Sequence, residues 1–152
     1  LTREVPSAPP PGTLTDRPSL LQTLTVAQVQ QRMKTDEILI IDARAPDRFN
    51  GLIEPIDPVA GHIPGAVNRF HARNLGPDNR LKPPEQLRQE FEALLAGREP
   101  GTVVHQCGSG ISACANLLAM THAGLDGSAL YPGSWSEWVA DPSRPVAKGS
   151  AA

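Results

Sequence analysis

Apolar residues recur at the three-to-four-residue spacing of an amphipathic helix in two segments of the chain. The first segment, "LTVAQVQQRM", carries Val26, Val29 and Met33 at this spacing, and Thr25 before them is a suitable N-cap. The second segment, "KPPEQLRQEFEALLAG", has Gly97 at its end and a single apolar stripe formed by Leu87, Phe91, Leu94 and Leu95. These segments predict a short first helix and a longer amphipathic helix.

Two other segments are apolar without alternation, which is typical of strands buried on both faces of a parallel sheet. They are "EILIIDAR" and "TVVHQ". Shorter strands are expected at Ala66 to Asn68 and within "SALYPG". The segment "APDRFNG" allows one helical turn, and "ACANLLAMTHAGL" follows "TVVHQ" as a helix. The segment "SWSEWVADP" predicts a short helix capped by Ser134 and stopped by Pro142. Strands that alternate with helices indicate an α/β domain with a mostly parallel sheet.

Composition narrows the classes of partner that we expect. The 152 residues suffice for one domain with its own core, and the formal charge of −2 shows no basic excess. We therefore expect neither nucleic acid nor an anionic membrane as a partner. The longest apolar runs, 38–41 and 117–120, fall far short of the roughly 20 residues that cross a bilayer. The chain is thus predicted not to be a membrane protein.

The beginning of the chain has a composition of its own. Residues 1–18 hold five of the sixteen prolines and few large apolar residues, which favours an extended linker between domains. The chain starts without Met and without the features of a signal peptide, so we expect that a part upstream was removed. Only two cysteines occur, Cys107 and Cys114, which favours a reducing compartment, the cytoplasm, over a secreted disulfide framework.

Cys107 stands in the loop "CGSGIS", directly after the predicted strand "TVVHQ". Ligands of parallel α/β sheets gather at the carboxyl ends of strands. Gly108 and Gly110 allow the backbone to curl so that several amide groups point inward, and the next helix adds the positive end of its dipole. This arrangement favours the thiolate of Cys107 over the thiol and could equally hold a persulfide. The loop is thus predicted to be an anion cradle made of backbone.

Four short motifs give the chain a resemblance to a known family. "DAR", "RFNG", "GHIPGAVN" and "CGSGIS" occur in the order and spacing of rhodanese domains, and "LYPGSWSEWVADPSRPVAKG" is similar to the end of tandem-domain sulfurtransferases. The resemblance covers about residues 24–149. It implies a rhodanese-like three-layer α/β domain over 19–152, with a mostly parallel central sheet flanked by helices. It also implies an upstream rhodanese domain, joined through the linker 1–18 and missing from this chain.

The same resemblance implies roles for individual residues. Cys107 would be the sulfur acceptor, and Ser109 would relay protons or polarise the substrate. Gly108, Gly110, Ile111 and Ser112 would form the cradle. "CGSG" is similar to the active loop of 3-mercaptopyruvate sulfurtransferases, and Arg48 matches the arginine that binds the carboxylate of mercaptopyruvate. A second arginine expected before "GHIPG" is absent from "LIEPIDPVA", so Arg69 and Arg73 are the candidates to replace it.

Other conspicuous residues are predicted to support the structure. Asp42 at a strand end should bond loop amides and be braced by Arg44. Cys114 is expected to be a small buried hydrophobe, and Trp135 and Trp138 to be packing anchors. His62 should bond a loop carbonyl. Because the four histidines share no metal-ligand spacing, we predict no metal site, and no cofactor is expected.

The leading hypothesis is an enzyme that takes sulfane sulfur from a small anionic donor, 3-mercaptopyruvate or thiosulfate. It would pass the sulfur through a Cys107 persulfide to a thiol or cyanide. A cysteine phosphatase or arsenate reductase would need an arginine to end the loop, and the sixth residue after Cys107 is Ala113. A noncatalytic or sulfur-carrier module that binds a partner within a larger protein stays open, because the linker implies a neighbour.

Overall fold

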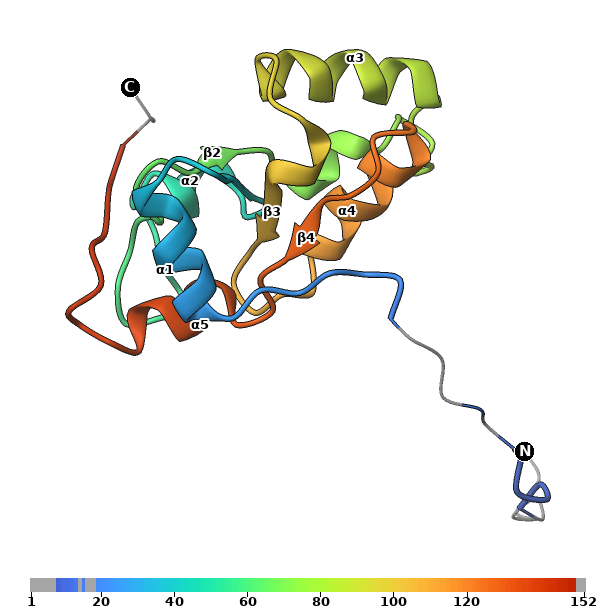
Figure 1. Cartoon of the computed structure of the whole chain (residues 1–152), viewed down its shortest axis with the longest axis horizontal. Coiled ribbons are helices and arrows are strands. Elements are labelled where there is room, and N and C mark those ends of the chain that lie inside the picture. Colours follow the sequence, from blue (N-terminus) through green and yellow to red (C-terminus); the bar gives the residue numbers. More distant parts are fainter. Residues whose placement is uncertain (1–7, 14, 16–18, 150–152) are drawn as a thin grey trace.

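The computed structural model describes residues 8–13, 15 and 19–149. Its centre is a four-stranded sheet in the order β2-β1-β3-β4, in which every neighbouring pair is parallel (Figure 1). The strands are β1 (Leu39–Asp42), β2 (Val67–Asn68), β3 (Val103–Gln106) and β4 (Ala129–Leu130). The predicted parallel α/β sheet is therefore confirmed.

Helices cover both faces of the sheet, which gives the three layers that the resemblance implied. On one face lie α1 (Val26–Lys34), α2 (Pro46–Phe49) and α5 (Ser134–Val139), and on the other α3 (Pro84–Leu95) and α4 (Ala113–His122). Two 3-10 turns, η1 (His71–Asn74) and η2 (Pro100–Thr102), complete the elements. Ile40 packs into the core between the sheet and α1, α2 and α5, and Ile41 packs into the core between the sheet and α3 and α4. Both faces of β1 are therefore buried, which explains why apolar and polar residues do not alternate along this strand.

The two amphipathic helices follow their sequence signals. Thr25 caps α1 through a reciprocal pair of bonds, in which its Oγ1 accepts from the Gln28 amide and Gln28 Oε1 accepts from the Thr25 amide. In α3 the residues Leu87, Phe91 and Leu95 are buried. Ala96 is the C-cap of α3 and has a left-handed backbone conformation. Gly97, predicted at the end of this helix, follows it.

The prediction that Ser134 caps α5 is wrong. The N-cap is Gly133, and Ser134 is the first helical residue, with a φ of 54°. Its hydroxyl group instead donates to the Tyr131 carbonyl and accepts a hydrogen bond from the Cys107 amide. The side chain therefore ties α5 to the end of β3.

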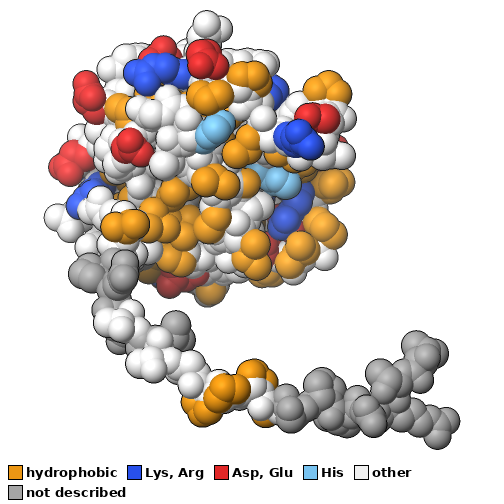
Figure 2. All heavy atoms as spheres, turned by 90° about the vertical axis from the view of Figure 1, so that its right-hand side faces the viewer, with side chains coloured by type: hydrophobic (Ala, Val, Ile, Leu, Met, Phe, Trp, Pro, Cys, Tyr) orange, Lys and Arg blue, Asp and Glu red, His pale blue; other side chains and the backbone are white. Residues whose placement is uncertain are grey.

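The segment that precedes α1 extends the sheet. The Leu24 amide donates to the Leu130 carbonyl at 2.8 Å, and the Leu130 amide donates to the Gln22 carbonyl at 2.9 Å. Residues 8–13 are exposed and lie away from the folded body (Figures 1 and 2). The rest of the predicted linker, except residue 15, lies outside the described residues, so the boundary near residue 19 stays a prediction.

Two further features are the distribution of charge on the surface and the length of the helices. Acidic and basic side chains are interspersed with hydrophobic ones on the face shown in Figure 2. No helix within the described part of the chain has the length and apolar character needed to cross a membrane.

Candidate active site

Cys107 is the first residue after β3, at the carboxyl end of the sheet. Its side chain is buried and packs with Ala43, Ala113 and Leu130. The start of α5 holds its backbone, because the Cys107 carbonyl accepts a hydrogen bond from the Trp135 amide at 3.1 Å. The thiol is therefore fixed at the junction between β3 and α4.

The loop from Gly108 to Ser112 turns directly into α4. The Gly108 carbonyl accepts from the Ser136 amide at 3.0 Å, so α5 also holds the loop. Gly110 has a φ of 82°, and a Cβ atom there would lie 2.6 Å from the Pro132 carbonyl oxygen. Both the left-handed conformation and the close approach require glycine at this position.

A cavity of about 240 Å³ lies beside Cys107. Most of the predicted site residues line it: Arg48, Cys107, Gly108, Ser109, Ile111 and Ser112. Gly110 is buried and faces Pro132 instead. Three further residues that we did not predict complete the lining, namely Ile56, Asp57 and Ser136.

Arg48, from α2, lies in this cavity and is already bound by carboxylates. Its Nε donates to Glu54 Oε2 at 3.2 Å and its Nη2 to Glu54 Oε1 at 2.6 Å. Nη2 also lies 3.3 Å from Asp57 Oδ2. Nη1 lies 3.5 Å from the point where a Cβ on Gly108 would stand. The guanidinium group thus reaches the cysteine loop with much of its charge neutralised.

Glu54 binds both nearby arginines. Its Oε2 lies 3.3 Å from Arg44 Nη1, and its Oε1 accepts from the backbone amides of Ile56 and Asp57. Burial alone would raise the pKa of Glu54, but the hydrogen bonds from Arg48 and these amides outweigh burial and lower it. Glu54 is therefore ionised and binds two guanidinium groups, those of Arg44 and Arg48.

Asp42 and Arg44 form a buried pair below the cavity. Arg44 donates from Nη2 to Asp42 Oδ2 at 2.7 Å, and its backbone amide donates to Asp42 Oδ1 at 2.9 Å. The same Nη2 donates to the Gly61 carbonyl, and the guanidinium group lies 4.6 Å from the centre of the Trp135 ring. These contacts link β1 to α5 and to the loop that carries Glu54.

Neither proposed replacement for the second arginine reaches the cavity. Arg69 is buried in the other layer, where it binds Glu90 and Asn74 and lies over Phe91. Arg73 is exposed and does not line the cavity. The suggestion that either compensates for the missing arginine is therefore wrong.

The prediction that Cys114 is buried is also wrong. Cys114 is exposed, and its Sγ lies 3.4 Å from the Gly110 carbonyl oxygen. The buried face of α4 is formed by Ala113, Asn116, Ala119 and Met120, and Cys114 falls outside it. Both cysteines are free.

The tryptophans and His62 make the contacts expected of structural residues. Trp135 and Trp138 are buried, and their indole nitrogens donate to the carbonyls of Val59 and Pro145. His62 Nδ1 lies 2.8 Å from the Phe49 carbonyl oxygen. Within the described ranges, no group of three His, Cys, Asp or Glu residues could hold a metal ion.

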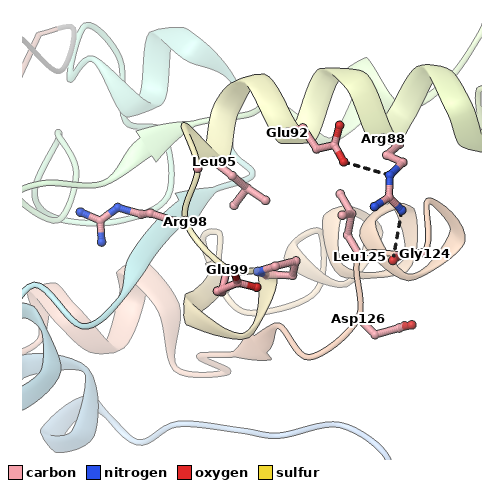
Figure 3. Close-up of a pocket in the computed structure, with 10 residues that line it drawn as sticks. Arg88, Glu92, Leu95, Arg98, Glu99, Gly124, Leu125 and Asp126 are labelled. Carbon is pink, nitrogen blue, oxygen red and sulfur yellow. Dashed lines mark hydrogen bonds and ion pairs between the residues drawn. The ribbon is translucent and has the colours of Figure 1, made fainter.

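A larger cavity, of about 480 Å³, lies at the opposite end of the strands, where residues lead into β3 and β4 (Figure 3). Arg88 binds Glu92 at 2.9 Å and also donates to the carbonyl of Gly124. Arg98 binds Asp36 at 2.8 Å. Because the lining of this larger cavity has no nucleophile and its arginines are paired, the cavity beside Cys107 is the candidate active site.

Sequence reasoning missed four residues of the site: Ile56, Asp57 and Ser136, which line the cavity, and Glu54, which binds Arg48. The segment "LIEPIDPVA" lacks the expected arginine, but two of its acids follow Arg48 within nine residues. That pattern is a signal for the Arg48 pairs. The bond from Ser136 Oγ to Asp57 Oδ1, 2.6 Å long, spans 79 residues and has no local signal.

Comparisons with known proteins identify the family of the chain. Residues 25–141 match the model of the rhodanese-like domain. The chain is 50% identical over 139 residues to the "Probable 3-mercaptopyruvate sulfurtransferase" of Pseudomonas aeruginosa, covering 91% of this chain and 49% of that protein. It is 34% identical over 151 residues to the thiosulfate sulfurtransferase of Bos taurus, covering 95% of this chain and 50% of that protein.

A solved structure has the same fold. The Tum1 protein from Saccharomyces cerevisiae superposes with a TM-score of 0.71 at 28% identity, over 84% of this chain and 46% of that one. The chain spans about half the length of the two curated relatives named above. On the sequence match and the shared fold, this chain belongs to the rhodanese-like domain family.

Proposed function

We propose that the chain is a sulfurtransferase domain in which Cys107 accepts a sulfane sulfur and carries it as a persulfide. The observation that carries the proposal is a buried cysteine at a strand end, facing a cavity that it shares with an arginine. The relatives named as 3-mercaptopyruvate and thiosulfate sulfurtransferases support this chemistry.

In the first half-reaction the thiolate of Cys107 attacks the sulfur of the donor. With 3-mercaptopyruvate, the new S–S bond forms as the C–S bond breaks, and the electron pair stays on carbon. The proton of the donor's thiol then protonates that carbon, so pyruvate leaves. With thiosulfate, the S–S bond of the donor breaks and sulfite leaves with the electron pair.

In the second half-reaction an acceptor attacks the outer sulfur of the persulfide. The S–S bond to Cys107 breaks, and the acceptor takes the outer sulfur. Cyanide is converted to thiocyanate, an acceptor thiolate is converted to a persulfide, and Cys107 returns to the thiolate in both cases. Atoms and charge balance in each half, and no cofactor is required. This is a double displacement with a covalent enzyme intermediate.

The loop and its neighbours have assigned roles in this proposal. The backbone amides of Gly108 to Ser112 would stabilise the outer persulfide sulfur, with the N-terminus of α4 adding its dipole. Ser109 would move or polarise the donor's proton. Arg48 would bind the donor's carboxylate through the nitrogen that Glu54 leaves free.

We also propose that an upstream rhodanese domain packs against this one in a longer cytoplasmic protein. Two apolar side chains at the cavity, Ile56 and Ile111, are 73% and 79% exposed, and a neighbouring domain would cover them. A noncatalytic module that only binds a partner is the alternative. The buried thiol beside a cavity favours the enzyme.

Mass spectrometry tests the proposal directly. After incubation with 3-mercaptopyruvate we expect an adduct of about 32 Da on Cys107, the mass of one sulfur atom, which disappears when cyanide is added. Cys107→Ser should carry no adduct and release no pyruvate. Cys114→Ser is the matched control and should retain both, because Cys114 is exposed outside the cavity. Pyruvate release by Cys107→Ser at the wild-type rate would refute the proposal.

A further inference from the structure

We infer that Asp57 is a specificity-determining residue that disfavours doubly charged sulfur donors, so that the site selects a donor with one negative charge. The inference rests on the proposed function and assigns its substrate class. It comes from the carboxylate of Asp57, which lines the Cys107 cavity.

Asp57 is held rigidly in the cavity wall. Its side chain is 7% exposed, and it lines the cavity together with Cys107 and Arg48. One carboxylate oxygen accepts a hydrogen bond from Ser136 Oγ at 2.6 Å, and the other lies 3.3 Å from Arg48 Nη2. The Asp57 amide is held in turn by Glu54. The carboxylate is therefore a fixed negative charge beside the place where a donor must bind.

The charges around the cavity leave no positive excess for a donor. The network of paired side chains consists of two arginines, Arg44 and Arg48, and three carboxylates, Asp42, Glu54 and Asp57. Its formal charge is thus negative by one. Nη1 is the one guanidinium nitrogen of Arg48 with no hydrogen-bond partner among the described residues. Asp57 competes with any donor anion for Nη2.

Donors of different charge should respond differently to this carboxylate. Thiosulfate is a dianion at neutral pH, whereas 3-mercaptopyruvate carries one charge on its carboxylate and a protonated thiol. Coulomb repulsion scales with the product of the charges, so a fixed carboxylate repels thiosulfate twice as strongly at a given distance. Arg48, neutralised by Glu54, can still offer Nη1 to a single carboxylate.

The test compares specificity constants for the two donors in the full 152-residue chain, with cyanide as acceptor. In Asp57→Asn we expect the ratio of kcat/KM for thiosulfate to kcat/KM for 3-mercaptopyruvate to rise on the order of tenfold. Asp57→Glu keeps the charge and should keep the wild-type ratio. Asp47→Asn removes the same charge one residue before Arg48, but Asp47 is exposed outside the cavity, so its ratio should not change. Equal changes for both donors in Asp57→Asn would overturn the inference.

A binding measurement separates this inference from the proposed function. Sulfate, a dianion, and pyruvate, a monoanion, are titrated for their ability to slow alkylation of Cys107 by iodoacetamide. Asp57→Asn should strengthen protection by sulfate on the order of tenfold and protection by pyruvate less. This pattern supports the inference even if the wild type transfers no sulfur, a result that would contradict the proposed function alone. Protection unchanged by Asp57→Asn contradicts the inference.

Discussion

At the scale of single residues, the site depends on close backbone approaches that only one residue type permits. Gly110 combines a φ of 82° with a tight fit, because a Cβ atom there would lie 2.6 Å from the Pro132 carbonyl oxygen. Gly65 has a similar φ of 78°, but a Cβ there would meet nothing within 4 Å. The two glycines therefore share a left-handed conformation that would strain any other residue, and they differ in the steric contact that a side chain would make.

This pair gives a matched test of the cysteine loop. Gly65→Ala should lower the free energy of unfolding by about 1 kcal/mol, the cost of a left-handed alanine. Gly110→Ala should lower it by about 2 to 4 kcal/mol, because the loop must also move away from Pro132. Urea unfolding checks the stabilities, and pyruvate release should fall only in Gly110→Ala. Equal losses of stability would show that the approach to Pro132 is relaxed at little cost.

Short motifs singled out Cys107, the proposed nucleophile, and its loop, but they missed part of the cavity wall. Cys107 and its glycines are adjacent in sequence, and their chemistry depends on local backbone geometry. Asp57 and Ser136 meet only because the segment after α2 folds back against α5, a contact between residues 79 apart. A single sequence without pair information contains no trace of such a contact.

At the scale of elements, a charged cluster around Glu90 fastens α3 to the segment between β2 and η1, which carries Arg69, and to the loop after η1, which carries Lys82. The Glu90 carboxylate lies 2.8 Å from Arg69 Nη2 and 2.9 Å from Lys82 Nζ, and Gln86 also donates to it. Burial alone would raise the pKa of Glu90, but the hydrogen bonds from Lys82, Arg69 and Gln86 outweigh burial and lower it to about 2. Arg69 is buried and would lose a partner without Glu90.

The Glu90 cluster predicts a pH dependence of stability. A lowered folded pKa stabilises the fold above the ordinary value of 4.5, and this contribution is lost as the pH falls through about 2. Glu90→Gln should therefore cost on the order of 1 to 3 kcal/mol at pH 7. The difference from wild type should shrink below pH 4.5. Urea unfolding at pH 7, 4 and 3 measures this, with the exposed Glu85→Gln in the same helix as control. A difference independent of pH would exclude the linkage.

The hydrophobic pattern predicted which segments form helices and which form strands. It did not predict the roles of individual residues such as Ser134 and Cys114. The run in β1 and the spacing in α1 and α3 reflect burial, which the pattern reports directly. Ser134 carries the residue type of an N-cap, yet its hydroxyl serves the Cys107 amide. Cys114 was placed correctly in a helix, but the buried face of α4 could not be identified because the helix is apolar on several sides.

At the scale of the whole molecule, the two ends of the parallel sheet differ in chemistry. The carboxyl ends carry Cys107 and the cavity beside it, and the opposite ends carry a cavity whose two arginines are paired with carboxylates. Two apolar side chains that line the first cavity are exposed, Ile56 and Ile111, which we call the apolar rim. Exposed apolar side chains beside a cavity are typical of a surface that a partner covers, and we propose this role for the apolar rim. The chain also spans about half the length of the curated relatives named above.

If an upstream domain covers the apolar rim, a protein of twice this length should bind less of a hydrophobic dye per cavity than this chain does. The double variant Ile56→Ser, Ile111→Ser should reduce anilinonaphthalene sulfonate fluorescence of this chain severalfold, because it removes the two exposed rim side chains that line the cavity. The same change in the longer protein should alter dye binding little and lower its stability, since the rim is then part of an interface.

Leu118 is an exposed apolar residue of α4 outside the cavity, so Leu118→Ser controls for the loss of any exposed apolar side chain. Equal dye binding by the two proteins would mean that the rim stays open to solvent and that the upstream domain lies elsewhere.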